Sequence, residues 1–253
     1  MNPGLYQRFF VTENQILNVA TRSLQFDQTL PAAVPGQFVM AWLPGVGEKP
    51  FSIAADRPFS LTVAAVGPFS QALASLQPGN ALFVRGPLGQ GFSPHGSNLL
   101  LAGGGYGAAP LKFLAQSALA RGARVTACLG ARSSANLLLD DELSALGCRV
   151  WTATEDGSSG RKGLVTDLVR AALEEGGVDG LFACGPEGML RALAELAQAF
   201  NVEAQLSFEG LMRCGIGLCG SCELAEEVCQ VVGLPDGWLV CRDGPVAVLP
   251  ARA

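Results

Sequence analysis

Basic residues are scarce in this sequence and are not clustered. Lysine and arginine number 17 against 22 acidic residues, which gives the 253-residue chain a formal net charge of −5. Nucleic acids and anionic membranes attract proteins through concentrated positive charge. The composition therefore argues against nucleic acid or a membrane surface as a partner and favours small molecules or another protein.

Residues 1–18 and 99–120 also lack the patterns expected of a secretion signal and of a membrane span. Residues 1–18 place Arg8, Glu13 and Asn14 among short apolar pairs, without the basic start and unbroken apolar core of a signal peptide. The most hydrophobic window, residues 99–120, contains four glycines and Pro110, so it predicts a buried strand, loop and helix. We expect a cytoplasmic protein that does not cross a membrane.

Histidine is nearly absent, because His95 is the only one in the chain. It lies in a Ser-Pro-His-Gly segment, where a solvated loop residue is expected. We therefore assign no catalytic role to histidine.

Cysteine is too sparse for a disulfide scaffold, with eight residues in the whole chain, but three of them are closely spaced. Cys214, Cys219 and Cys222 have the C-x4-C-x2-C spacing of a plant-type 2Fe-2S cluster and are interleaved with glycines. Structural zinc and disulfides are the alternatives, and this spacing is unusual for zinc. Spacing alone leaves the fourth ligand open between Cys229 and Cys241.

The hydrophobic pattern divides the chain into three regions. Residues 1–95 contain many short apolar runs separated by Gly and Pro, which predicts a small antiparallel β-barrel. Residues 96–204 alternate β runs with amphipathic helices, which predicts a doubly wound parallel sheet. Residues 205–253 carry the cysteine cluster and a short strand at 246–249, in a module too small for a core of its own.

The second region carries the pattern of a dinucleotide-binding loop. Gly103, Gly104, Gly105 and Gly107 follow a strand and precede a helix that begins near Pro110. Such a loop lets a pyrophosphate approach the backbone at the start of a helix, although a tight structural turn would have the same composition.

The fourth strand of the same region ends in Cys184-Gly185-Pro186. The carboxyl ends of strands in an open α/β sheet are where ligands bind, so these residues are candidates for the same site. A buried inert cysteine is the alternative for Cys184.

In the first region, Lys49-Pro50-Phe51-Ser52 places a cation, an aromatic ring and a hydroxyl at the start of a strand. This arrangement suits a flat ring such as a flavin, and an ordinary core strand is the alternative. A nicotinamide delivers two electrons as hydride while an iron-sulfur cluster takes one at a time. A flavin is the usual converter between them, so the three regions together predict one.

On these motifs the chain resembles ferredoxin-reductase-type flavoproteins, and within them the electron-transfer subunits of NAD-linked dihydroorotate dehydrogenases. Further segments that carry the resemblance are Gly86-Pro87-Leu88-Gly89-Gln90-Gly91-Phe92, residues 207–215 and residues 241–246.

The resemblance implies a residue set for each cofactor. FAD would bind Lys49, Pro50, Phe51 and Ser52, with its diphosphate near Gly67 and Ser70. NAD would bind Gly103, Gly104, Gly105, Gly107, Cys184, Gly185 and Pro186. The cluster would be held by Cys214, Cys219, Cys222 and Cys241, so Cys241 is preferred to Cys229. Glu209 and Cys184 would lie near the flavin and nicotinamide.

Some positions depart from the family pattern. Lys49 stands where the family usually has arginine, so a bidentate phosphate contact becomes a point charge. Residues 61–66 lack the expected Tyr and Arg, and the interval from Cys222 to Cys241 is longer than usual. FAD affinity is therefore the family property that these departures affect most.

The implied function is that of an NAD-oxidoreductase subunit in pyrimidine (UMP) biosynthesis. It would pass electrons between NAD and a flavin-containing dihydroorotate dehydrogenase subunit, in a heterotetramer with two copies of each, and would have no dihydroorotate-oxidising site of its own. One alternative is a related subunit of a hydrogenase, glutamate synthase or transhydrogenase. An alternative of another class is a zinc-containing, nucleotide-binding regulatory module. Arg132, Ser133 and Ser134 could receive the 2′-phosphate of NADP, so NAD is preferred only on family grounds.

Overall fold

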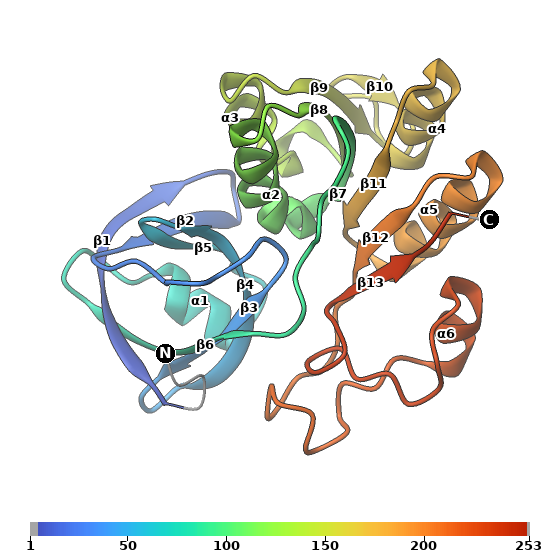
Figure 1. Cartoon of the computed structure of the whole chain (residues 1–253). Helices are drawn as coiled ribbons and strands as arrows, with labels where there is room; N and C mark the ends of the chain where they lie inside the picture. The colour runs from blue at the N-terminus through green and yellow to red at the C-terminus, as the bar shows by residue number, and fades with distance from the viewer. Residues whose placement is uncertain (1–4, 252–253) are drawn as a thin grey trace.

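The structure is a computed structural model that describes residues 5–251. The first four residues of the predicted barrel region and the last two of the predicted C-terminal module lie outside the described residues. A barrel, an α/β layer and a C-terminal segment that lies beside both are visible in Figure 1.

The first region is a closed six-stranded antiparallel barrel with the strand order β1-β2-β5-β4-β3-β6, as the punctuated apolar runs predict. Alternate residues point into a core rich in phenylalanine, where the stacked rings of Phe26 and Phe59 have centroids 5.0 Å apart. Its elements are β1 (Gln7–Ile16), β2 (Thr21–Phe26), β3 (Phe38–Leu43), β4 (Gly47–Asp56), β5 (Phe59–Ala64), α1 (Pro68–Ala74) and β6 (Ala81–Leu88).

The second region is built on a seven-stranded sheet with the order β10-β9-β8-β7-β11-β12-β13, in which β13 and most of β12 come from the third region. All neighbouring strands are parallel except β13, which pairs antiparallel with β12. The predicted doubly wound parallel sheet is therefore confirmed, with one antiparallel strand added at an edge. The strands are β7 (Asn98–Gly104), β8 (Arg124–Ala131), β9 (Arg149–Thr154), β10 (Arg161–Lys162), β11 (Gly180–Cys184), β12 (Ala204–Ser207) and β13 (Val246–Leu249).

Helices cover both faces of this sheet, which explains why its central strands are apolar on both sides. α2 (Ala109–Ala120) and α3 (Asp140–Ala145) pack on one face, and α4 (Val165–Glu175) and α5 (Glu187–Phe200) pack on the other. Two 3-10 turns, η1 (Gly105–Ala108) and η2 (Ser134–Asn136), complete the layer. α2 also contacts β4 and buries Phe113 in the barrel core, so it joins the two regions.

The C-terminal segment has no separate core. Cys222, Val228 and Trp238 are buried in the same cluster as the inner residues of α4 and α5, and α6 (Glu226–Val232) packs against α5. On its other side, this cluster includes Met40 and Leu88 from the barrel. The cysteine-bearing loop is thus fixed between both larger units, with β13 anchored in the sheet.

The amphipathic pattern predicts helices over residues 110–121, 164–175 and 187–200, and these form as α2, α4 and α5, each within one residue of its expected start. The short elements α3, β10 and α6 were not predicted, because each is too short to show a clear period in the sequence. Within residues 5–251, no helix combines the length and apolar character needed to cross a bilayer.

Candidate functional site

Two adjoining clefts open where the barrel meets the α/β layer. The first, called the glycine cleft, has a volume of about 710 Å³ and is lined by both glycine loops of the sheet and by the β1–β2 turn of the barrel. The second, called the barrel cleft, has a volume of about 590 Å³ and lies between β4, α1 and the segment that follows β12. Both volumes are in the range of small-molecule sites.

The glycine cleft is shaped by two loops that touch backbone to backbone. A Cβ atom on Gly107 would lie 2.6 Å from Cα of Gly185, and one on Gly104 would lie 2.7 Å from Sδ of Met189. Only glycine allows loops at the ends of β7 and β11 to approach this closely. Gly105 has φ of +55°, and a Cβ there would meet nothing within 4 Å, so an open space lies in front of it.

Five of the seven residues predicted for NAD line the glycine cleft: Gly104, Gly105, Gly107, Gly185 and Pro186. Gly103 does not, because it packs against Ala108, where a Cβ would come within 2.8 Å of the alanine Cβ. Cys184 lies on the barrel cleft instead. Pro110 falls in the first turn of α2, as the sequence predicts.

Cys184 is almost fully buried at the end of β11 and is hydrogen-bonded to Ser207 of the neighbouring strand. Burial raises the pKa of its thiol to about 12. The side chain is therefore a neutral thiol at physiological pH and not a thiolate nucleophile.

The barrel cleft is lined by all six residues predicted for FAD: Lys49, Pro50, Phe51, Ser52, Gly67 and Ser70. Phe51 and Phe69 form an aromatic pair at 6.0 Å on its barrel side. Phe208, Gly210 and Met212 come from the segment that leads to the cysteines. The cleft is thus apolar, with a small number of polar groups, as a site for a flat aromatic ring requires.

Among the described residues that line the barrel cleft, only Lys49 and Glu209 are charged. Lys49 is its only cation and forms no ion pair among residues 5–251, so it is available to an anionic group. Ser70 Oγ accepts hydrogen bonds from the amides of Val66 and Gly67 at 3.0 Å each. These contacts hold the turn before α1 in shape and occupy two amides of the turn near which the diphosphate is predicted.

The two clefts share a wall made of Ala64, Val66, Tyr106, Gly107 and Glu209. Burial raises the pKa of the Glu209 carboxyl, and the nearby carboxylate of Glu209, followed by burial, raises the pKa of Tyr106. Glu209 was a candidate from the sequence. Tyr106 was not, although an aromatic residue inside a glycine loop is a signal that could have found it.

Four cysteines meet in the C-terminal loop as two pairs. Cys219 is in side-chain hydrogen-bond contact with Cys214, and Cys241 is in such contact with Cys222. The amide of Gly217 donates to Cys241 Sγ at 3.1 Å, and the amide of Leu218 donates to Cys214 Sγ at 3.3 Å. Amide donors of this kind stabilise thiolate sulfur.

Cys229 faces away from these pairs. It is fully buried on α6, with its thiol directed at the carbonyl of Leu224 at 3.8 Å. Among the described residues, no three His, Cys, Asp or Glu side chains converge as ligands of a single metal ion would. Two thiol pairs, by contrast, correspond to the two irons of a 2Fe-2S cluster, each of which takes two thiolates.

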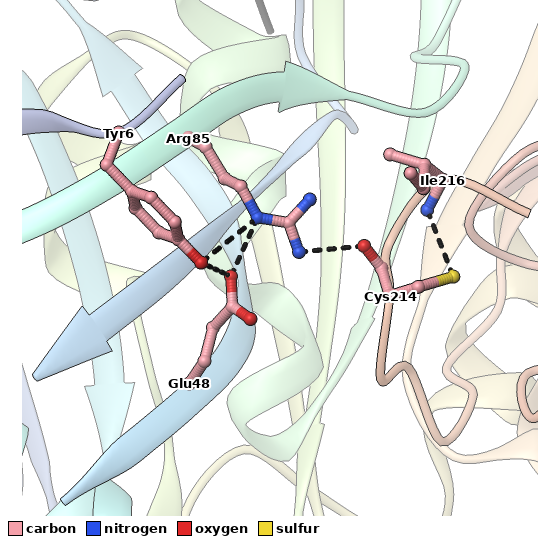
Figure 2. A network of polar contacts seen from close by, with 5 residues as sticks. All are labelled: Tyr6, Glu48, Arg85, Cys214 and Ile216. Carbon is pink, nitrogen blue, oxygen red and sulfur yellow. Dashed lines mark hydrogen bonds and ion pairs between the residues drawn. The ribbon is translucent and has the colours of Figure 1, made fainter. Parts of the chain in front are cut away.

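A partly buried polar network connects the barrel to this loop (Figure 2). Arg85 of β6 donates from Nη2 to the carbonyl of Cys214 at 2.7 Å, and from Nε to Glu48 Oε1 at 2.8 Å. Tyr6 donates its hydroxyl hydrogen to the same carboxylate oxygen. Sequence reasoning missed this network, since a charged residue within an apolar strand was its only signal.

The family model and the similar proteins found by comparison all describe NAD-linked oxidoreductases. The oxidoreductase NAD-binding domain model matches residues 101–195. A probable dihydroorotate dehydrogenase B (NAD(+)) electron transfer subunit of Thermococcus kodakarensis is 42% identical over 238 residues, which is 93% of this chain and 94% of that protein. A protein of the same description from Methanopyrus kandleri is 43% identical over 214 residues, covering 84% of this chain and 78% of that one.

Solved structures agree on the architecture. A chain from the structure of the NADH-dependent reduced ferredoxin-NADP oxidoreductase, which was used to study flavin-based electron bifurcation, aligns with a TM-score of 0.82 at 28% identity. The alignment covers 95% of this chain and 87% of that one. The flavohem-like FAD/NAD binding domain of nitric oxide dioxygenase from Vibrio cholerae aligns with a TM-score of 0.67 at 18% identity, over 78% and 94%, and supports the fold alone.

Proposed function

This chain belongs to the family of dihydroorotate dehydrogenase B electron transfer subunits, and from this premise we propose that it relays electrons between NAD and a dihydroorotate-oxidising partner subunit. The partner would carry its own flavin, and the reaction would serve pyrimidine biosynthesis. In this chain the relay would use FAD in the barrel cleft, a 2Fe-2S cluster at the cysteine loop and NAD in the glycine cleft.

The observation that carries this proposal is the continuity of the three sites. The glycine cleft and the barrel cleft share the wall formed by Tyr106, Gly107 and Glu209. The barrel cleft in turn is lined by Leu211 and Met212, and Cys214 follows two residues later. A nucleotide, a flavin and a cluster in these places would be immediate neighbours.

The residues of the barrel cleft fit FAD by their chemistry. Pro50 and Phe51 offer an apolar surface to a ring, and Ser52 offers a hydroxyl to its polar edge. Lys49 would pair with phosphate as a point charge, and Gly67 leaves open space, because a Cβ there would meet no atom within 4 Å. When bound, FAD supplies the exchange of a two-electron hydride for single electrons.

The glycine cleft fits a nicotinamide dinucleotide. Gly104, Gly105 and Gly107 would admit the pyrophosphate at the start of η1 and α2, and Gly185 with Pro186 would face the nicotinamide half. Arg132 is the only cation among the described residues that line the cleft, and the carboxylate of Glu155 lies in the same lining. A carboxylate there disfavours a 2′-phosphate, so we propose NAD as the nucleotide. The neutral thiol of Cys184 and the carboxyl group of Glu209 would lie between the nicotinamide and the flavin ring.

The cysteine loop fits a 2Fe-2S cluster through Cys214, Cys219, Cys222 and Cys241. The paired arrangement of their thiols and the amides directed at two of the sulfur atoms support this set over one that includes Cys229. Leu211, Ile216 and Leu218 are exposed beside the loop and would be covered by the partner subunit, in an assembly of two copies of each in the cytoplasm.

Co-expression with a dihydroorotate-oxidising subunit tests the proposal. The complex should reduce NAD with dihydroorotate as electron donor, whereas the partner alone should not. In the Cys222→Ser complex this coupled activity should be lost, while the partner should still pass electrons from dihydroorotate to an artificial dye. Coupled NAD reduction in the Cys222→Ser complex at the normal rate would refute a relay through the cluster.

A second candidate is a subunit of a bifurcating ferredoxin-NADP oxidoreductase or a related hydrogenase, glutamate synthase or transhydrogenase. The TM-score of 0.82 with a chain of the NADH-dependent reduced ferredoxin-NADP oxidoreductase supports this second candidate. The two candidates differ in the protein that co-purifies with this chain and in whether dihydroorotate or reduced ferredoxin bleaches the complex. A zinc-containing regulatory module is the candidate of another class, and it would be colourless.

A further inference from the structure

Among residues 5–251, Arg85 is the only cation of the barrel that forms a hydrogen bond with the cysteine loop. Its side chain is 10% exposed and lies on β6, opposite Met40 of β3. Nη2 points toward the carbonyl of Cys214, while Nε points in the opposite direction toward Glu48 and Tyr6 (Figure 2). The positively charged guanidinium therefore lies between the Glu48 carboxylate and the cysteine loop.

The loop is in close contact with the barrel at the same place. A Cβ on Gly215, the residue after Cys214, would lie 2.9 Å from Cγ of Met40 and 3.4 Å from Cδ1 of Leu88. With φ of +70°, Gly215 also turns the chain so that the amides of Ile216 and Leu218 point at Cys214 Sγ. The hydrogen bond from Arg85 is thus the polar part of a contact whose apolar part is Met40 and Leu88.

Glu48 and Tyr6 fix the direction of the guanidinium. Glu48 is 24% exposed on its side chain and pairs with Arg85 through a single oxygen, to which Tyr6 also donates. An arginine held on one side by such a pair presents its remaining N–H groups in a rigid fork. Because the group is largely buried, its charge is screened less by water than the exposed charges of Arg213 or the Arg242–Asp243 pair.

We propose that Arg85 is a positioning residue for the cluster: its hydrogen bond to Cys214 fastens the cysteine loop to the flavin-binding barrel, and its buried positive charge raises the reduction potential of the cluster. The inference rests on the proposed function, because it requires the cluster that Cys214 would ligate. The cluster gains one negative charge when it accepts one electron, and a nearby fixed positive charge favours that reduced state. Glu48 partly offsets the effect and holds Arg85 in place.

A redox titration of the whole chain, followed by the EPR signal of the reduced cluster, tests this proposal. In Arg85→Met, the ratio of reduced to oxidised cluster at a fixed potential should fall about tenfold, a shift of about 59 mV for a one-electron couple. Glu48→Gln should move the potential in the opposite direction, because it removes the compensating negative charge. Arg85→Lys should stay nearer the parent potential, since it keeps the charge and loses the fork.

Arg8→Met is the matched control. It removes an exposed arginine from the same barrel, whose guanidinium lies over Phe10 at 4.9 Å and forms no ion pair among residues 5–251. Its potential should equal that of the parent. Equal potentials in the parent, Arg85→Met and Glu48→Gln would overturn the proposal, as would equal shifts in Arg8→Met and Arg85→Met.

Two further results separate the inference from the proposed function. If Arg85→Met does not retain its cluster, the question is decided by Glu48→Gln, whose potential should rise, and by Arg85→Lys, whose potential should stay near that of the parent. A parent chain that contains zinc in place of iron and sulfide refutes the proposed function itself. If the parent chain contains a cluster and the cluster has the same potential in every variant, only the role of Arg85 is refuted.

Discussion

The glycine cleft and the cysteine loop are the two ends of the proposed electron path, and they are built by opposite means. In the cleft, two backbone loops touch directly, with Gly107 against Gly185, and the strands that carry them are neighbours in the sheet. The cysteine loop is held by side chains from remote segments, among them Arg85 and Met40 of the barrel. A site made from backbone is specified by a short motif, whereas a site held by side chains depends on the packing of the whole molecule.

The largest effect is expected on iron content, when one of the four candidate cluster thiols is removed. Cys241→Ser removes one member of a thiol pair, so the iron content of the purified chain should fall at least about tenfold. Cys229→Ala is the matched control. It should keep its iron and lose only about 1–2 kcal/mol of unfolding free energy, because Cys229 is a buried apolar group on α6.

Iron and acid-labile sulfide analysis of both variants decides between the two cysteines. Loss of iron in Cys229→Ala with retention in Cys241→Ser would reverse the assignment of the fourth ligand.

A second comparison tests the backbone contact in the glycine cleft. Gly107→Ala places a Cβ 2.6 Å from Cα of Gly185, so it should reduce the free energy of unfolding by about 1–3 kcal/mol. Gly188→Ala meets no atom within 4 Å and lies in α5, so it should increase it by about 0.5–1 kcal/mol. Urea unfolding, followed by tryptophan fluorescence, measures both. Equal effects of the two substitutions would show that the loops do not depend on close contact.

The affinity for FAD should change less than the properties measured in the two preceding comparisons, because Lys49 is exposed. Lys49→Gln removes the only cation of the barrel cleft and should raise the FAD dissociation constant about tenfold. Lys49→Arg should bind FAD at least as tightly as the parent, since a guanidinium can contact phosphate through two N–H groups. Titration of the flavin-free chain with FAD, followed by flavin fluorescence, gives the constants. An unchanged affinity in Lys49→Gln would place the phosphates elsewhere.

The smallest effect concerns the wall between the two clefts. The carboxylate of Glu209 raises the pKa of Tyr106, because a phenolate formed beside a negative charge is disfavoured. In Glu209→Gln, Tyr106 should therefore lose its proton at a lower pH. The chain has only two tyrosines, so carbon-13 NMR of the ring carbon bonded to oxygen resolves the titration. The pKa of Tyr6, whose hydroxyl contacts Glu48 and Arg85, should not change. A Tyr106 titration that is unchanged in Glu209→Gln would contradict this contact.

The sequence predicts the parts of the molecule that local patterns determine. The barrel, the alternation of strands and helices along the chain and the glycine loops follow from periodicity and turn residues. The C-x4-C-x2-C spacing indicates three of the four cluster candidates. In each case the relevant residues are close together in the chain or repeat with a fixed period.

The remaining features depend on contacts between distant residues. The spacing alone does not distinguish Cys241 from Cys229, because the choice depends on how α6 packs against α5. The position of Cys184 on the barrel cleft depends on how far β11 extends before Gly185. Arg85 meets Cys214 across 129 residues of sequence, which no local pattern reports.

An anaerobic visible spectrum of the purified chain, combined with flavin, iron, sulfide and zinc analysis, tests the central claim most directly. The proposed relay predicts flavin and iron-sulfur absorbance that bleaches on addition of NADH, with two irons per chain. A colourless chain that contains zinc and does not oxidise NADH would contradict the relay and leave only the fold in common with the family.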